Sequence, residues 1–311
     1  MKIRDVRPII VNMPFVRTGV PLPKSNVSTI VIVQVTTDEG ITGIGQSFTT
    51  LSSNSAATLA KAVETMIKPK AVGRDPMAVA ALWDEMYYAF YSVGRSGITI
   101  AALSGFEIAL WDIKGKALNT PVYQLLGGPA HDKLRAFASL SQYAKPAEAA
   151  KASEVVVGRG FTALKMHFGD VDSLAAVRKS VGDKMDVMVD LTGNCRWDAA
   201  TAVRMGREFE KYNPYWYEQP VFPHDDYAGL AEVKAKLSVP LATGEDEYTA
   251  RNFTRLIETR AVDILQPSIV KIGGILQEKK VFAMAEAFNL RVAPNCWSAG
   301  PAMAATLHVC F

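Results

Sequence analysis

Val187-Met188-Val189-Asp190 is a short apolar run that ends on an acidic residue, and the chain repeats this arrangement twice. Tyr215-Trp216-Tyr217 leads to Glu218, and Leu241-Ala242-Thr243-Gly244 leads to Glu245. The acidic residues are separated by 28 and 27 positions, which fits one strand and one helix in each interval. The spacing therefore predicts parallel strands that alternate with helices, each strand ending at a carboxylate.

Carboxylates at the carboxyl ends of successive barrel strands point into one shared mouth. A buried negative charge is unfavourable unless it is paired or binds a metal. Asp190, Glu218 and Glu245 therefore predict a site for one divalent cation, the alternative being ion pairs with Lys or Arg residues at the mouth. Oxygen ligands favour Mg²⁺, or Mn²⁺ as a substitute, over zinc.

A second strand-like run, Phe-Thr-Ala-Leu-Lys-Met-His at 161–167, carries two titratable nitrogens. Side chains two residues apart on a strand share a face. Lys165 and His167 are therefore expected to point into the mouth, and Met166 is expected to point to the helix layer. The alternative is a surface strand with two solvated polar residues.

The composition argues against several classes of protein. The chain has 311 residues, 49% of them hydrophobic, and its net charge of +3 comes from scattered Lys and Arg residues. Without basic blocks no nucleic-acid partner is expected, and without an apolar run of about 20 residues no membrane partner is expected. Three cysteines with no CxxC motif and no secretory signal indicate a cytoplasmic protein.

Two regions differ in their pattern of hydrophobic residues. Residues 1 to about 52 read as β-strands with a Gly-ended turn at 37–40, and residues 54–126 have a helical period, which together predict an α+β domain. From about residue 134 strands alternate with helices, as in a βα barrel. The expected strands are 134–139, 162–167, 185–190, 215–218, 240–245, 262–266 and 291–294.

Seven expected strands are one fewer than a closed eight-stranded barrel needs. A seam between the seventh strand and the first would leave backbone groups unpaired, at about 1 to 3 kcal/mol for each buried group. The chain as given is therefore expected not to close a monomeric barrel. Further residues or a partner subunit are expected to cover the gap.

The segment Ala-Leu-Ser-Gly-Phe-Glu-Ile-Ala-Leu-Trp-Asp-Ile-Lys-Gly-Lys at 102–116, with its continuation to Gly127, resembles the signature of the mandelate racemase and muconate lactonizing enzyme group of the enolase superfamily. Glu218-Gln219-Pro220 and Lys271-Ile272-Gly273-Gly274 extend the resemblance. It implies an N-terminal α+β capping domain over residues 1–127. It also implies a TIM-type (β/α)7β barrel over residues 128–311, C-terminally incomplete and lacking its last strand.

The same resemblance implies one Mg²⁺ bound by Asp190, Glu218 and Glu245, and removal of a proton α to a carboxylate. The racemase branch has Lys-x-Lys on the second barrel strand, whereas this chain has Lys165-Met166-His167. A histidine ordinarily exchanges its proton near neutral pH, so His167 is predicted to be the general base, with Lys165 pairing with the substrate carboxylate. The alternative is that His167 only hydrogen-bonds substrate hydroxyls.

An Asp and a His that the branch places on its sixth and seventh strands are replaced here by Ser268 and Asn295. Asn295 cannot exchange a proton at neutral pH, but it can bind a substrate hydroxyl or an enolate oxygen. The Asn usually found two residues after the metal-binding Asp is Thr192 in this chain. A bulge at Gly193 is expected to return Asn194 to the site, the alternative being that this contact is lost.

These features favour a Mg²⁺-dependent lyase, most simply a sugar-acid dehydratase, since dehydration needs one base and a route for the leaving hydroxide. The alternatives are a one-sided cycloisomerase or epimerase of the same superfamily, and a carboxylate-binding protein with weakened activity. The polar loops near 14–28 and 47–54 suit a small hydroxy carboxylate as the partner. Lys271 is expected to bind substrate together with Asn194 and Asn295, in a cytoplasmic homo-oligomer.

Overall fold

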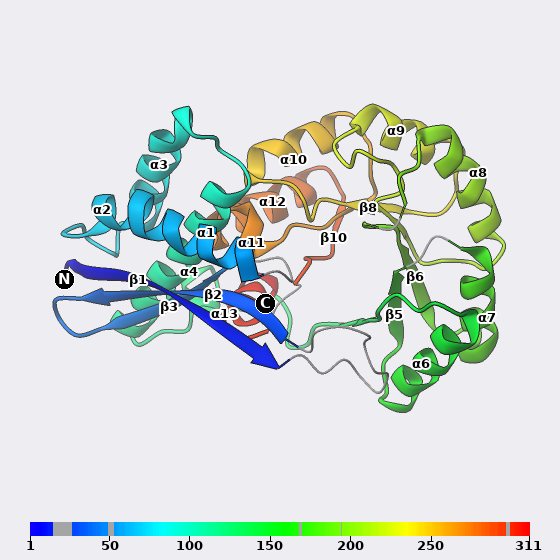
Figure 1. Ribbon diagram of the computed structural model, residues 1–311, viewed down its shortest axis with the longest axis horizontal. Helices are drawn as coiled ribbons and strands as arrows, with labels where there is room; N and C mark the ends of the chain where they lie inside the picture. Colours follow the sequence, from blue (N-terminus) through cyan, green and yellow to red (C-terminus); the bar gives the residue numbers. More distant parts are fainter. Residues whose placement is uncertain (15–26, 49–52, 168–169, 194, 297–298) are drawn as a thin grey trace.

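The computed structural model describes residues 1–14, 27–48, 53–167, 170–193, 195–296 and 299–311. Two sheets organise these residues: a three-stranded sheet near the N-terminus and a curved seven-stranded sheet in the second half (Figure 1). None of the described helices is both long enough and apolar enough to cross a membrane.

The N-terminal sheet is antiparallel and has the order β1-β2-β3. Its strands are β1 (Ile3–Pro14), β2 (Val27–Thr37) and β3 (Thr42–Ser47). The turn between β2 and β3 is the expected hairpin. Gly40 takes a positive φ of 84° there, a conformation that glycine adopts without a steric penalty.

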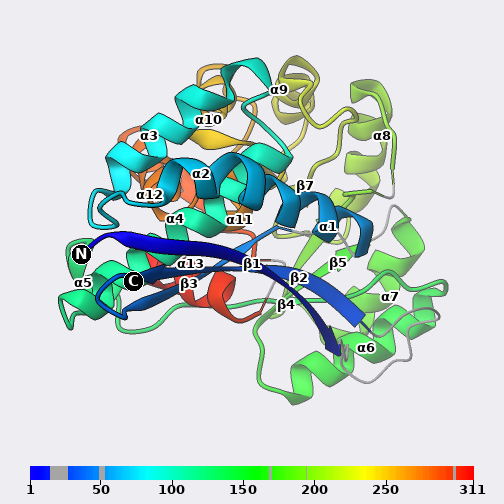
Figure 2. The ribbon, with the colours of Figure 1, turned by 60° about the vertical axis from the view of Figure 1, so that its left-hand side comes forward.

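Helices pack against this sheet (Figure 2), and α4 (Ile98–Ala117) lies directly on β3. A Cβ atom on Gly45 would approach the Gly105 carbonyl oxygen to 1.9 Å, so the crossing requires glycine at residue 45. The other elements are α1 (Ser53–Ala62), the π-helical turn η1 (Val63–Ile67), α2 (Lys68–Ala71), α3 (Val79–Ala89), the 3₁₀ turn η2 (Phe90–Ser92) and α5 (Val122–Leu125).

The second sheet confirms the predicted alternation of strands and helices. Its parallel strands have the order β10-β9-β8-β7-β6-β5-β4. They are β4 (Ala138–Ser139), β5 (Ala163–His167), β6 (Asp186–Asp190), β7 (Tyr217–Glu218), β8 (Leu241–Thr243), β9 (Ile264–Leu265) and β10 (Arg291–Val292). β4 is much shorter than the expected strand 134–139, and it pairs with β5 over two residues only.

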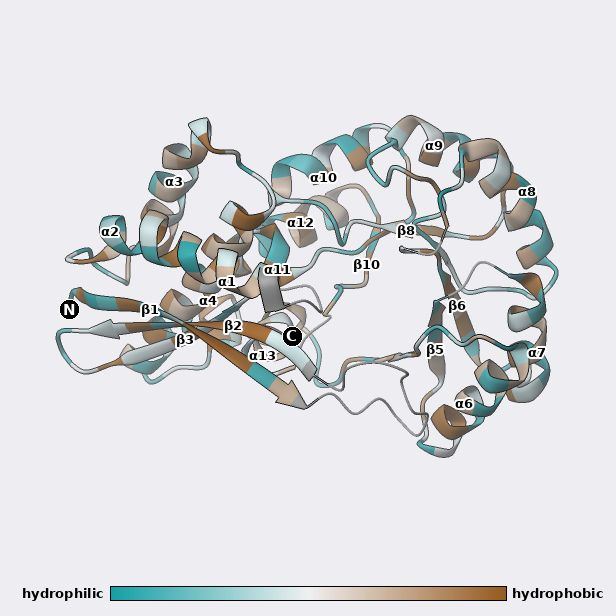
Figure 3. Ribbon diagram, in the orientation of Figure 1, coloured by the Kyte–Doolittle hydropathy of each residue, from teal (hydrophilic) through white to brown (hydrophobic). Residues whose placement is uncertain are grey.

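Helices form the outer layer of the barrel region: α6 (Pro146–Gly158), α7 (Val171–Val181), α8 (Ala199–Glu210), α9 (Tyr227–Lys236), α10 (Thr249–Glu258), α11 (Ile269–Ile272), α12 (Ile275–Ala287) and α13 (Pro301–Cys310). Three of them begin alike, since Asp170, Asp198 and Asp226 each accept a hydrogen bond from the backbone N–H three residues later. Figure 3 shows hydrophobic residues along β5 and β6 and hydrophilic residues on α7 and α8.

β4 and β10 are the edge strands of this sheet in the described part of the chain. The expectation that other residues or a partner subunit cover the seam between them stays a prediction. The division at residue 127 also stays a prediction.

Glu107 of α4 joins the two regions. Its buried carboxylate accepts hydrogen bonds from the backbone N–H groups of Ile275 (2.7 Å) and Leu276 (2.9 Å) at the start of α12, and from the Trp111 indole (2.8 Å). A Cβ atom on Gly274 would lie 2.0 Å from Glu107, so the contact requires glycine there. Burial raises the pKa of Glu107 to about 7, although the three hydrogen bonds oppose the shift.

Glu278 lies nearby on α12 and is 0% exposed. Neither of its carboxyl oxygens has a hydrogen-bond partner among the described residues. Burial, and after it the charge of Glu107, raises the pKa of Glu278 well above its ordinary value. The contact between α4 and α12 therefore contains two acidic groups that are favoured in their neutral forms.

We predict that Glu278→Met stabilises the protein by about 1 to 3 kcal/mol at about pH 8, because it removes a buried group that has no partner. The folded-state pKa values of Glu107 and Glu278 are raised, so the folded state binds more protons than the unfolded state. The contribution of Glu107 to wild-type stability is therefore largest below pH 4.5 and falls as the pH rises through about 7, and the contribution of Glu278 also falls with rising pH. Urea unfolding across this range measures the effect.

The gain from Glu278→Met should grow with pH, since ionisation of Glu278 is what makes its burial most unfavourable. Glu286→Met changes an exposed glutamate on the same helix and serves as the control. It should alter the free energy of unfolding by less than about 0.5 kcal/mol. A Glu278→Met protein that is less stable than wild type at about pH 8 would contradict this account.

Candidate active site

The candidate site lies at the carboxyl ends of β5 to β8, above an apolar layer inside the curve of the sheet. That layer consists of Ala163, Met188, Trp216, Ala242 and Ile264. Two residues further along their strands stand Lys165, Asp190 and Glu218. The strand register places Asp190 beside both His167 and Glu218. The alternation of each strand thus brings these four predicted side chains together.

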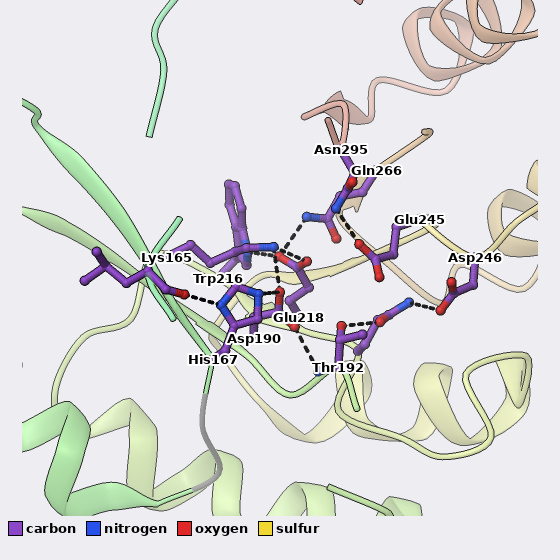
Figure 4. Close-up of polar contacts among 12 residues, drawn as sticks. Lys165, His167, Asp190, Thr192, Trp216, Glu218, Glu245, Asp246, Gln266 and Asn295 are labelled. Carbon is purple, nitrogen blue, oxygen red and sulfur yellow. Dashed lines mark hydrogen bonds and ion pairs between the residues drawn. The ribbon is translucent and has the colours of Figure 1, made fainter. Parts of the chain in front are cut away.

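Lys165 lies between two of the predicted metal ligands (Figure 4). Its Nζ is 2.6 Å from Asp190 Oδ2 and 2.7 Å from Glu218 Oε1, and the residue is only 3% exposed. Burial alone would lower the pKa of Lys165, but the Glu218 and Asp190 carboxylates outweigh it and raise the pKa. Lys165 is therefore a charged ammonium that compensates buried negative charge.

Asp190 and Glu218 respond differently to their shared environment. Burial would raise the pKa of Asp190, but Lys165 and His167 outweigh it and hold the pKa well below the usual range. Burial and the charge of Asp190 raise the pKa of Glu218 to about 8. Glu218 Oε2 accepts hydrogen bonds from Trp216 Nε1 and Gln266 Nε2, both at 2.8 Å. Glu218 is thus the acidic group least well compensated in this arrangement.

Two contacts determine the orientation of His167. Its Nδ1 lies 2.6 Å from the backbone oxygen of Leu140, and its Nε2 lies 3.1 Å from Asp190 Oδ2. Because a carbonyl oxygen can only accept, Nδ1 carries a hydrogen. Nε2 is therefore the nitrogen that faces the mouth and Asp190. Met166, between Lys165 and His167, packs with the helix layer as predicted.

Glu245 follows β8 and reaches the same mouth from the next strand (Figure 4). Asn295, beyond β10, donates a hydrogen bond from Nδ2 to Glu245 Oε2. Burial raises the pKa of Glu245, against the opposing charges of Lys271 and Lys165. The structure therefore brings Asn295 to a predicted metal ligand.

Lys271 is engaged on both sides. Its Nζ lies 2.8 Å from Asp246 Oδ1 and 4.4 Å from the ring centroid of Phe48, just beyond β3. Burial would lower the pKa of Lys271, but Glu245 and Asp246 outweigh it and raise the pKa. A charged, paired lysine is a poor proton acceptor, so this geometry favours a binding or positioning role.

Ser268 occupies the position where the racemase branch has its Asp. Its hydroxyl is buried and has no hydrogen-bond partner among the described residues, and the same holds for Gln266 Oε1. Asn194 lies outside the described residues, as do 15–26 and 49–52 of the expected entry loops. Gly193 has a positive φ of 72°, which glycine adopts readily, but the predicted return of Asn194 to the site stays a prediction.

Sequence reasoning did not select Trp216 and Gln266, although both bind Glu218. Their signal was available, because Trp216 precedes Glu218 by two residues and Gln266 follows Ile264 by two, so each shares a strand face with an inward residue. Thr192 and Gln219 were also not recognised as partners of each other.

The ligating atoms are not gathered around a common point. Among the described residues, no three Cys, His, Asp or Glu side chains are close enough together to hold a metal ion as they stand. Lys165 bridges Asp190 and Glu218, and Glu245 is turned to Asn295. Cation binding at these carboxylates would therefore require Lys165 to exchange its partners.

Two family models match the chain. Residues 11–127 match the mandelate racemase and muconate lactonizing enzyme N-terminal domain, and residues 147–311 match the enolase C-terminal domain-like family. The chain is 36% identical over 296 residues to a D-galactonate dehydratase of Klebsiella pneumoniae, covering 90% of this chain and 74% of the relative. It is 33% identical over 290 residues to an arabinonate dehydratase of Saccharolobus solfataricus, covering 90% and 76%.

A comparison with solved structures agrees with these sequence matches. The fold is similar to the crystal structure of the 3,6-anhydro-D-galactonate cycloisomerase from Zobellia galactanivorans, with a TM-score of 0.89 and 30% sequence identity. The match covers 99% of this chain and 84% of that chain.

We predict that Lys165→Met lowers the free energy of unfolding by about 3 to 5 kcal/mol in the presence of a chelator, because it leaves Asp190 and Glu218 buried without their cation. Adding Glu218→Gln to this variant should recover part of the loss, since it removes one of the two buried acidic groups that are left without a cation. Lys211→Met, which breaks an exposed pair with Glu208, is the control and should cost less than about 1 kcal/mol. Urea unfolding tests all three, and wild-type stability of Lys165→Met would disprove the compensating role of Lys165.

Proposed function

The chain belongs to the mandelate racemase and muconate lactonizing enzyme group of the enolase superfamily, and from this premise we propose that it removes the proton α to the carboxylate of a sugar acid and dehydrates that acid. Its relatives are dehydratases and a cycloisomerase, so the chain is an enzyme of the lyase or isomerase type. The observation that carries the proposal is the entry of Lys165 and His167 into the mouth beside Asp190, at 2.6 and 3.1 Å.

Asp190, Glu218 and Glu245 would hold the divalent cation. Their donors are all oxygens, which fits Mg²⁺, with Mn²⁺ as a substitute. The balance of charges supports this fit. Among the described residues at the mouth, these three acidic groups and Asp246 face two ammonium groups, those of Lys165 and Lys271. When bound, the cation supplies positive charge where negative charge develops on the substrate carboxylate.

Lys165 and His167 have different roles in the proposed reaction. With Asp190 and Glu218 holding the cation, the Lys165 ammonium would be free to pair with the substrate carboxylate. His167 is the general base: its Nδ1–H is bonded to Leu140, and its Nε2, which lies 3.1 Å from Asp190 Oδ2 here, would accept the α-proton once Asp190 is bound to the cation. Both side chains come from β5, so one strand positions substrate and base relative to each other.

This single base is sufficient for dehydration, because the proton that it removes is the one that it later returns. His167 takes the α-proton, and the electron pair of the C–H bond moves toward the carboxylate to form an enediolate. This species expels the β-hydroxyl, and protonated His167 returns its proton to the leaving oxygen, so that water departs. The resulting enol becomes a 2-keto-3-deoxy acid. Neither Ser268 nor Asn295 can accept a proton at neutral pH, which supports a lyase over a two-base racemase.

A sugar acid is proposed as the substrate because the relatives are named for arabinonate and D-galactonate. A one-sided cycloisomerase is the second candidate, favoured by the similarity to the 3,6-anhydro-D-galactonate cycloisomerase. Both reactions begin with the same proton abstraction. The mass of the product distinguishes them, since dehydration removes one water from the substrate, whereas the product of a cycloisomerase has the same mass as its substrate.

We also propose a capping domain at residues 1–127, a barrel domain at 128–311, a cytoplasmic location and a homo-oligomeric state. An exposed pair of aromatic residues on the capping region supports association. Tyr88 and Tyr91 are 74% and 71% exposed, and their ring centroids lie 6.3 Å apart.

We predict that His167→Asn abolishes exchange of the substrate α-proton with deuterated solvent, because asparagine cannot act as a base. Mn²⁺ binding should be nearly intact, since the three carboxylates belong to other strands and the asparagine amide can also donate a hydrogen bond toward Asp190. A panel of acid sugars with Mg²⁺ in D₂O, followed by NMR, measures exchange and turnover together. His131→Asn, at an exposed position outside the site, is the matched control and should exchange normally.

Exchange at the wild-type rate in His167→Asn would transfer the role of base to another residue, with Lys165 the first to test. If wild type exchanges no acid in the panel although it binds Mn²⁺, the chain is a carboxylate-binding protein and the proposed reaction is wrong.

A further inference from the structure

Each candidate metal ligand has a close sequence neighbour that is tied to the next strand. Thr192 follows Asp190 by two residues, Gln219 follows Glu218 directly, and Asp246 follows Glu245 directly. Thr192 Oγ1 donates a hydrogen bond to Gln219 Oε1, and Gln219 Nε2 donates to Asp246 Oδ2 at 3.2 Å (Figure 4). One continuous path therefore crosses the ends of β6, β7 and β8.

Both ends of this path are anchored. At one end, the Thr192 backbone N–H donates to Asp190 Oδ1 at 2.8 Å, which restricts the rotation of that carboxylate. At the other end, Asp246 pairs with Lys271 at 2.8 Å, and Lys271 lies against the Phe48 ring. The path thus runs from a candidate ligand to a residue of the N-terminal region.

Gln219 occupies a backbone conformation that needs support. Its φ is +47°, in the left-handed region that non-glycine residues seldom adopt, and the residue is 2% exposed. The side-chain bonds to Thr192 and Asp246 use both the carbonyl and the amino group of Gln219. These bonds help to hold the backbone of Gln219, and Glu218 precedes it directly.

From this arrangement we propose that Thr192, Gln219 and Asp246 are positioning residues for the divalent cation, forming a relay anchored by Lys271 that holds Asp190, Glu218 and Glu245 in mutual register. The inference rests on the cation site proposed above. Thr192 is the decisive member, because this chain has threonine where the racemase branch has asparagine, and its hydroxyl is the link between β6 and β7.

The relay contributes to geometry more than to folding stability. Thr192 is half-buried and the Asp246 side chain is 42% exposed, so water can replace their contacts in part. Mutation of a residue that orients a metal ligand, in contrast, commonly weakens metal binding by about 10- to 100-fold. Metal affinity is therefore the readout that separates positioning from a purely structural role.

The test compares Thr192→Val, which removes the hydroxyl at nearly constant shape and charge, with Thr192→Ser, which keeps it. Mn²⁺ binding to the substrate-free protein is measured by electron paramagnetic resonance, and thermal unfolding is measured with a chelator. We expect Thr192→Val to raise the Mn²⁺ dissociation constant about 10-fold or more, with a metal-free Tm close to wild type. Thr192→Ser and the distant control Thr259→Val should bind Mn²⁺ as wild type does.

The outcomes are distinct. If wild type binds no Mn²⁺, the proposed cation site is wrong, and the proposed relay is therefore wrong as well. If wild type and Thr192→Val bind equally well, the site stands and the relay is wrong. If Thr192→Ser, which keeps the hydroxyl, loses as much affinity as Thr192→Val, the loss does not depend on the hydroxyl, and the relay is again wrong.

A double variant gives an independent check. Gln219→Met removes the middle of the relay without adding charge. Since Thr192 acts through Gln219, Thr192→Val should weaken Mn²⁺ binding by less than about twofold when Gln219→Met is already present. Fully multiplicative losses in the double variant would overturn the relay.

Discussion

Buried negative charge at the mouth of the barrel is the constraint on which the rest of this structure depends. Asp190, Glu218 and Glu245 reach one region from the ends of neighbouring strands, where each would be unfavourable alone. Lys165 compensates two of them, yet the pKa of Glu218 is still raised to about 8. A site that needs more positive charge than its own lysines supply is suited to a divalent cation and an anionic substrate.

The fold meets this constraint in layers. An apolar layer around Trp216 fills the space below the charged residues, and the strand register sets their order. Outside them, Gln266 and Trp216 donate to Glu218, and Asn295 donates to Glu245. Between the N-terminal region and the barrel region, Glu107 connects α4 to the start of α12. The chemistry of the mouth therefore depends on contacts that reach from the barrel into the N-terminal region.

Much of this could be predicted from the sequence, because it follows from periodicity. The alternation of β5 puts Lys165 and His167 on one face, and the spacing of Asp190 and Glu218 puts them on neighbouring strands. The family signature was confirmed by the domain matches and by relatives that are named sugar-acid dehydratases. The pairing of Lys165 with two carboxylates was anticipated only as the alternative to a metal site, and Lys165 was not singled out for it, since such a balance of charges is not encoded in any pattern. The link from Thr192 to Gln219 was also missed, because it joins different strands through a backbone with positive φ.

The most direct test of the account is a crystal structure with Mn²⁺, phased on the anomalous signal of the metal. The account predicts one strong anomalous peak with oxygens of Asp190, Glu218 and Glu245 about 2.0 to 2.4 Å from it, and the Lys165 ammonium withdrawn from the two carboxylates that it bridges in this structure. A fully occupied Mn²⁺ peak elsewhere in the protein, with Lys165 still paired to Asp190 and Glu218, would contradict it.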